Sequence, residues 1–132
     1  MKQIAQQFGQ ALDKDDFATT RALLTDDCVY VIGDETLTGP VAIANSYEDN
    51  MIAGRKKLDK LVWGESRVEP VSDNEYYVHF TDYLTHQGKE YTHRCKQKVT
   101  VNLDNKIERI EHIHDEDEQA RLDEYYRSVG LK

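Results

Sequence analysis

Two stretches of the chain alternate between apolar and polar residues, which is the pattern of β-strands with one buried face. In the stretch 91–103, one face is apolar toward Leu103, while the opposite face is polar throughout. At its other end the apolar face carries His93, Cys95 and Gln97. Polar groups on a buried face are costly unless something pairs with them, so this face predicts a pocket rather than a solid core.

The stretch 76–84 alternates in the same way, and Asp82 lies on its more apolar face. Burial there would raise the pKa of the Asp82 carboxyl, and a charged partner would lower it. Perturbed carboxyls in clefts are often functional, so Asp82 is the first candidate for acid–base chemistry. The alternative is a structural carboxylate that anchors a neighbouring hydroxyl or backbone N–H.

The remaining periodicity places helices at both ends of the chain. Residues 2–12 form an amphipathic helix, Asp13 or Asp15 caps a second short helix, and Gly39-Pro40 opens a third. The acidic run 115–118 begins a last helix, and we assign it only helix-start chemistry. Strands are predicted at 28–32, 58–68, 75–85, 91–103 and 106–114. Helices segregated from a mainly antiparallel sheet predict a single α+β domain over residues 1–132.

The last strand has an irregular pattern, because its isoleucines at 107, 110 and 113 fit neither face. A β-bulge or a strand buried on both sides would explain this spacing. The pattern leaves two registers open, one that turns His112 inward and one that presents Arg109 and Glu111.

Composition narrows the class of partner. The chain has 25 acidic and 17 basic residues and a net charge of −8, which argues against nucleic acid and anionic membranes as partners. No run of apolar residues approaches the length needed to span a membrane. The first residues of the sequence predict an amphipathic helix rather than a signal peptide. Cys28 and Cys95 read as free thiols in a reducing compartment, so we expect a cytoplasmic protein.

The order of elements, with TGPVAIANSY opening the third helix and KQKVTVNLDNKIERIEHI as a terminal hairpin, resembles the nuclear transport factor 2-like superfamily. Within it the chain looks most like the SnoaL-like proteins, which include polyketide cyclases. The resemblance implies a cone-shaped, curved, mixed but mostly antiparallel sheet (cystatin-like). This sheet would wrap around three N-terminal helices, with a C-terminal helix added. It also implies a ligand cavity in the cone and, often, a dimer through the sheet.

The resemblance also suggests site residues. Asp82 falls at the first aspartate of limonene epoxide hydrolases, with Phe80 at their arginine and His112 at their second aspartate. SnoaL-like cyclases place an acid–base aspartate near His112 as well. The pattern of steroid isomerases is not kept, because Phe8 stands at their tyrosine and Gln97 at their oxyanion-hole carboxyl; Val31 stands near their general base.

We therefore expect Asp82 and His112 to meet in the cone as an acid–base pair. The resemblance turns His114 inward together with His112. The pocket residues expected around the pair are Tyr30, Tyr47, Trp63, Phe80, His93, Cys95, Gln97 and His114. An alternative interpretation is a metal site made by His93, Cys95, His112 and His114. These residues come singly from neighbouring strands and do not form a metal-binding motif, so we expect no metal and no cofactor. A buried thiol such as Cys95 is normally inert.

Two functions of different class follow. The first is isomerase-, cyclase- or dehydratase-type proton transfer on a small apolar or amphipathic molecule. The second is a non-catalytic ligand-binding or dimerisation module that uses the same cone. A homodimer is expected in either case, because one sheet face is left uncovered and carries hydroxyl and aromatic groups.

Overall fold

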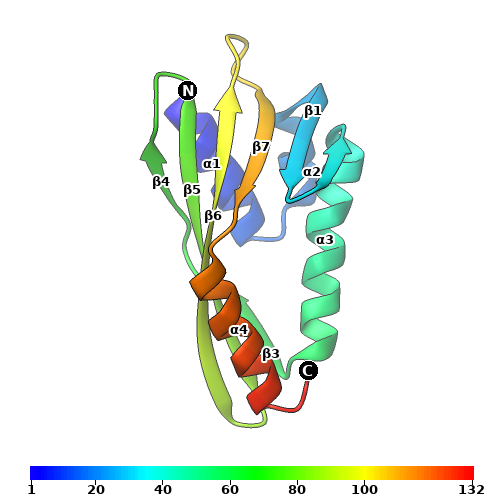
Figure 1. Cartoon of the computed structure of the whole chain (residues 1–132). Helices are drawn as coiled ribbons and strands as arrows, with labels where there is room; N and C mark the ends of the chain where they lie inside the picture. The colour runs from blue at the N-terminus through cyan, green and yellow to red at the C-terminus, as the bar shows by residue number, and fades with distance from the viewer.

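A curved sheet with four helices along it makes up the computed structural model, which describes residues 1–132 (Figure 1). The helices are α1 (Lys2–Asp13), α2 (Phe17–Ala22), α3 (Pro40–Lys57) and α4 (Glu116–Ser128). The strands are β1 (Leu24–Ile32), β2 (Glu35–Thr38), β3 (Lys60–Trp63), β4 (Arg67–Pro70), β5 (Glu75–His86), β6 (Lys89–Val101) and β7 (Ile107–Ile113). The expected α+β architecture is confirmed.

The strands lie in the order β2-β1-β7-β6-β5-β3, and β4 pairs with β5 beyond the end of β3. Every pair is antiparallel except β1 with β7. The long β5–β6 hairpin extends past the last paired residues of β7, Ile113 and its partner Lys96. The sheet is therefore narrower at this end, where only β6, β5 and the short β3 continue into the part of the molecule next to α4 (Figure 1).

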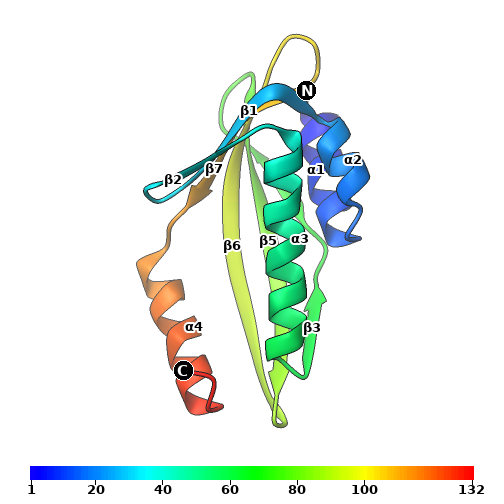
Figure 2. The ribbon, with the colours of Figure 1, turned by 90° about the vertical axis from the view of Figure 1, so that its right-hand side faces the viewer.

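The main core lies between the N-terminal helices and the inner face of the sheet. Phe8 of α1 and Ile43 of α3 are fully buried against Val78, Val99 and Ile110 of the three central strands. Burying side chains of this size contributes about 1.5–3 kcal/mol each. In Figure 2, α1, α2 and α3 all lie on the same side of the sheet. This packing holds the wide end of the cone together.

Helix α4 is held by a second, smaller cluster at the other end of the hairpin. Tyr125 of α4 and Val129, the residue after the helix, pack with Leu58 and Leu84, and Tyr125 donates a hydrogen bond to the Lys89 carbonyl at 2.7 Å. Helix α4 lies along the β5–β6 hairpin, well apart from α1 and α2 (Figures 1 and 2). The C-terminal helix therefore closes a side of the cone that the sheet does not cover.

The predicted strand at 58–68 is wrong in detail, because two short strands, β3 and β4, take its place. Trp63 pairs with Asp82 and Arg67 with His79, so three residues face two on β5 and the chain must bulge away. Ser66, within the bulge, donates from its backbone N–H and its hydroxyl to the Asp13 carboxylate, both at 2.8 Å. These bonds draw the segment toward the end of α1.

Two further differences concern strands β2 and β6. Strand β2, which the sequence analysis did not predict, pairs with β1 through a turn at Gly33, whose φ is +56°. Strand β6 ends at Val101 instead of continuing to Leu103, which is 92% exposed. The chain turns here because the Asn102 side chain accepts hydrogen bonds from the backbone N–H groups of Asp104 and Lys106.

The irregular isoleucine spacing of the last strand has the expected explanation. Thr100 pairs with Arg109 and Val101 with Ile107, so Glu108 is an extra residue in β7. This bulge brings both Ile107 and Ile110 into the core. It also settles the register, because His112 then lies on the inner face while Glu111 approaches Lys98 on the outer face at 3.8 Å.

Candidate functional site

A cavity of about 560 Å³ lies between the β5–β6 hairpin, α3 and α4, within the usual size range of small-molecule pockets. More than half of its lining residues are hydrophobic. Helix α3 contributes Tyr47 and Met51, β3 contributes Trp63, and α4 contributes Leu122 and Tyr126. Segments far apart in the sequence thus supply the walls of the cavity.

Most of the predicted site residues line this cavity. They are Tyr30, Tyr47, Trp63, Phe80, Asp82, His93, Cys95, Gln97 and His112. The expectation for His114 is wrong. This residue follows the end of β7, is exposed, and lines a neighbouring polar pocket of about 500 Å³ that shares His93, Cys95 and His112 with the main cavity.

Asp82 stands on the cavity wall without a hydrogen bond to any other protein group, directly across from His93 on the neighbouring strand. Burial raises the pKa of Asp82 from 3.8 to about 6; His93 opposes this increase, and the negative charge of Asp13 adds to it. A carboxyl with such a pKa exchanges its proton near neutral pH, which is the property required of a general acid or base.

His112 and Asp82 do not meet. His112 pairs with Gln97, and Asp82 pairs with His93, so their partners lie four positions apart along β6. This offset is about 13 Å along the sheet, and no hydrogen bond joins the two side chains. Burial, with His114 and His93 nearby, lowers the pKa of His112, so its imidazole is neutral at neutral pH. The expected Asp82–His112 pair is therefore wrong, because the two side chains are separate groups on the wall of one cavity.

A buried polar network forms around Gln97, which is 5% exposed. The Tyr47 hydroxyl donates to Gln97 Oε1 at 2.5 Å, and Gln97 Nε2 donates to the Tyr30 hydroxyl at 2.7 Å. The two tyrosine rings stack with centroids 5.2 Å apart. Because the Tyr30 oxygen accepts from Gln97, its own proton is available to an acceptor in the cavity.

The rim near α1 is held by two aspartates. Asp15 accepts hydrogen bonds from Trp63 Nε1 and from Arg55, at 2.7 and 2.8 Å. Asp13 is engaged with Ser66. These carboxylates are already paired within the protein, so they fix the Trp63 indole in the cavity wall and are poorer candidates for ligand chemistry than Asp82.

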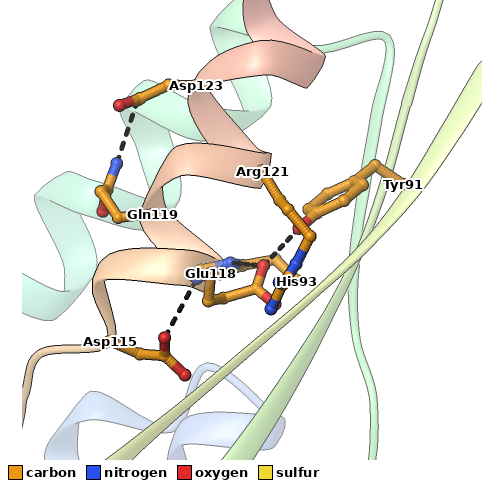
Figure 3. A network of polar contacts seen from close by, with 7 residues as sticks. All are labelled: Tyr91, His93, Asp115, Glu118, Gln119, Arg121 and Asp123. Atoms are coloured by element: carbon orange, nitrogen blue, oxygen red, sulfur yellow. Dashed lines mark hydrogen bonds and ion pairs between the residues drawn. The ribbon is translucent and has the colours of Figure 1, made fainter.

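Glu118 is a site residue that sequence reasoning missed. It lies on the first turn of α4, is only 9% exposed, and accepts hydrogen bonds from the Tyr91 hydroxyl, from His93 Nδ1 at 2.9 Å and from Arg121 at 3.2 Å (Figure 3). Burial raises the pKa of Glu118, but these hydrogen bonds outweigh the effect and leave the pKa below its ordinary value. The carboxylate is therefore ionised at neutral pH.

The thiols offer little reactivity. Burial raises the pKa of Cys95 to about 12, and the charges of Asp82 and Glu118 act in the same direction. The pKa of Cys28 is also raised to about 12, again chiefly by burial. Neither is a thiolate at neutral pH, and the thiolate is the nucleophile. No three His, Cys, Asp or Glu side chains converge as a set of metal ligands.

The fold defines an α+β protein with a curved, mostly antiparallel sheet and a partly open, mostly hydrophobic cavity. The sequence model of the SnoaL-like domain matches residues 1–121, and the chain belongs to this family. The match ends within α4, so the second half of this helix, including Tyr126, lies outside it.

Several solved structures share the fold. A candidate polyketide cyclase from Xanthomonas campestris pv. campestris has a TM-score of 0.69 at 14% identity, covering 97% of this chain and 95% of that one. TerC, co-crystallised with polyporic acid, has a TM-score of 0.68 at 17% sequence identity, and the match covers 93% of this chain and 97% of that one. The Mycobacterium tuberculosis protein Rv0760c, in complex with estradiol-17β-hemisuccinate, has a TM-score of 0.63 at 19% sequence identity. The match covers 88% of this chain and 94% of that one. At these identities the likeness concerns the fold alone.

Among curated proteins, none matches this sequence. No helix of the structure combines the length and apolar character needed to cross a lipid bilayer.

Proposed function

We propose that this protein binds a small apolar or amphipathic molecule in the cavity and moves a proton on it, as an isomerase- or cyclase-type enzyme. One observation carries the proposal. Asp82 is a carboxyl with no hydrogen-bond partner in the protein and a pKa of about 6, on the wall of a mostly apolar cavity. A buried carboxyl of this kind costs stability, and perturbed carboxyls in clefts are often functional.

In the proposed step, ionised Asp82 accepts a proton from an acidic C–H or O–H group of the ligand. The proton then returns from Asp82 to a different atom of the same ligand, so the composition of the ligand is unchanged and no co-reactant is needed. A positioned base of this kind contributes about 10²–10⁴-fold in rate. The apolar walls exclude water from the charge that develops during the transfer.

His112 acts at a second point of the ligand in this proposal. Its neutral imidazole has one N–H, which can donate to a ligand oxygen that gains negative charge when the proton is removed. The Tyr30 hydroxyl can donate in the same way. Both groups are separated from Asp82 along the sheet, so the ligand spans the distance between them.

A fluorescence titration tests binding, because Trp63 is the only tryptophan of the chain and lines the cavity. Polyporic acid and estradiol hemisuccinate are suitable first probes, since relatives of the same fold hold them. We expect a saturable change in Trp63 emission that is weakened in Cys95→Phe, because the larger side chain occupies part of the cavity. The matched variant Leu103→Phe, at an exposed position, should keep it.

Deuterium exchange tests the chemistry. The bicyclic ketone 2-tetralone has an acidic C–H group, and its exchange in D₂O is followed by NMR. We expect the wild type to accelerate exchange above the buffer rate and Asp82→Asn to fall to that rate while still binding. Binding without acceleration in the wild type would contradict the catalytic proposal and favour a non-catalytic ligand-binding module.

The outer sheet face supports a further proposal, that two copies associate through it. Val62, Tyr83 and Thr92 pair across β3, β5 and β6, and Val62 and Tyr83 are 43% and 49% exposed. Such a row of apolar and hydroxyl groups suits a self-complementary interface.

A further inference from the structure

The contact between Glu118 and His93 has a chemical consequence for the cavity. An ionised carboxylate is an acceptor only, so the nitrogen that it contacts must carry a proton. Glu118 is ionised at neutral pH, and His93 Nδ1 lies 2.9 Å from its Oε2. When His93 is neutral, its single proton therefore sits on Nδ1, and the lone pair is on Nε2.

The Nε2 atom has no hydrogen bond to the protein, in contrast to Nδ1. His93 lines the main cavity, and its residue pairs directly with Asp82 on β5. Side chains of directly paired residues lie on the same face with Cβ atoms about 4.5–5.5 Å apart. The free nitrogen of His93 and the free carboxyl of Asp82 are thus neighbours on the cavity wall.

We propose that Glu118 is a positioning residue that holds His93 as the Nδ1–H tautomer, so that His93 Nε2 serves as a proton acceptor beside Asp82. This inference rests on the proposed function for its catalytic meaning, but the tautomer itself does not. It replaces the expected Asp82–His112 pair with Asp82 and His93 as the two neighbouring groups that handle protons. A proton taken up by Asp82 can pass to Nε2, which leaves His93 as imidazolium stabilised by the Glu118 carboxylate.

The surroundings of Glu118 fit a positioning role better than a helix cap. Asp115, the residue before α4, already accepts the hydrogen bond from the Glu118 backbone N–H at 3.1 Å. The Glu118 side chain turns instead toward β6, where Tyr91 and His93 both donate to the same oxygen (Figure 3). Arg121 contacts the other oxygen and supplies a compensating charge. Helix α4 thereby delivers a buried carboxylate to the site.

Histidine NMR tests the proposal without any ligand. Long-range proton–nitrogen spectra of the ¹⁵N-labelled full chain distinguish a protonated from an unprotonated ring nitrogen, and the His93 signals are assigned by their loss in His93→Gln. In the wild type, under conditions where His93 is neutral, we expect a protonated Nδ1 and an unprotonated Nε2. In Glu118→Gln the population should shift measurably toward the Nε2–H form.

Two variants serve as controls. Tyr91→Phe removes the other hydrogen bond to the same carboxylate oxygen but leaves its charge, so His93 should keep the Nδ1–H form. Glu69→Gln removes the partner of His79 on the outer face, 2.8 Å away, and should leave the His93 signals unchanged. Backbone spectra establish that each variant is folded.

An Nε2–H tautomer in the wild type would overturn the proposal, as would unchanged populations in folded Glu118→Gln. Either result could occur while ligand binding and Asp82-dependent exchange persist, so it would leave the proposed function standing. Conversely, absent ligand binding with a Glu118-dependent tautomer would contradict the proposed function alone.

Discussion

At the scale of single residues, the site combines groups that the sequence could indicate with one that it could not. The alternation of β5 and β6 placed Asp82, His93, Cys95 and Gln97 on the inner face, because one-sided burial leaves a readable period of two. Glu118 was missed because an acidic residue three positions after Asp115 is typical of a helix start. Its true partner, His93, is 25 residues away, and local patterns carry no information about that contact.

Asp82 also affects stability, and the direction follows from its pKa. Between about pH 4 and 6 the unfolded chain has ionised Asp82 while the folded chain keeps it protonated. The folded state then binds more protons, so its stability falls as the pH rises through this window. A shift from 3.8 to about 6 corresponds to at most about 3 kcal/mol lost above pH 6.

The substitution Asp82→Asn removes this penalty. Relative to the wild type, we expect the variant to be equally stable near pH 4 and more stable at pH 7, by up to about 3 kcal/mol. Urea unfolding at a series of pH values measures the difference. The control Asp49→Asn, on the exposed side of α3, should follow the wild type, and an Asp82→Asn variant that loses stability at pH 7 would show that the carboxylate is structurally required.

At the scale of elements, the four helices were predicted correctly, and the bulge in β7 was one of the two explanations left open for the isoleucine spacing. The expected cap of the second helix was wrong, because Asp16 accepts the hydrogen bond from the Thr19 backbone N–H. Asp13 and Asp15 bond instead to residues around β3 and β4.

The split of the 58–68 strand was not predictable from local patterns. It depends on Ser66 bonding to Asp13, 53 residues earlier, and on the close approach of α1 to β4 and β5. Strand β2 was missed because its four residues are mostly exposed and make no strong pattern.

Gly9 is a position where α1 approaches the sheet closely. A Cβ atom there would collide with the Ser66 hydroxyl and lie 3.1 Å from Val78 Cγ1. Alanine favours a helix over glycine by about 1 kcal/mol, but overpacking costs about 1–3 kcal/mol. We therefore expect Gly9→Ala to lower the free energy of unfolding despite its better helix propensity. Chemical denaturation measures this change, and a stabilised Gly9→Ala variant would contradict the close approach. The control Gln10→Ala, on the exposed face of α1, should keep a free energy of unfolding within about 0.5 kcal/mol of the wild type.

At the scale of the whole molecule, the cavity depends on parts of the chain that are far apart in sequence. Patterns on single strands predicted which side chains face inward but not their depth in the cone. Asp82 and His112 were expected to meet, yet depth follows from the register of β5 and β7 on β6, which places their partners four positions apart. The register in turn depends on the Glu108 bulge.

Association of two copies through the outer sheet face is also a property of the whole molecule. We expect light scattering at micromolar concentration to give twice the mass of one chain. Tyr83→Glu, which places a charge in the exposed row of β5, should shift the equilibrium toward the monomer, whereas the distant surface variant Leu103→Glu should not. A monomer mass for the wild type would exclude the interface.

The central claim is that Asp82 holds and releases a proton near neutral pH inside the cavity. Carbon-13 NMR of the aspartate carboxyls measures this directly when the Asp82 signal is assigned by its absence in Asp82→Asn. We expect a titration midpoint near 6 for Asp82 in the folded chain, well above the ordinary 3.8. A midpoint at or below 4 would mean that the carboxyl is solvated or paired, and it would contradict the proposed acid–base role.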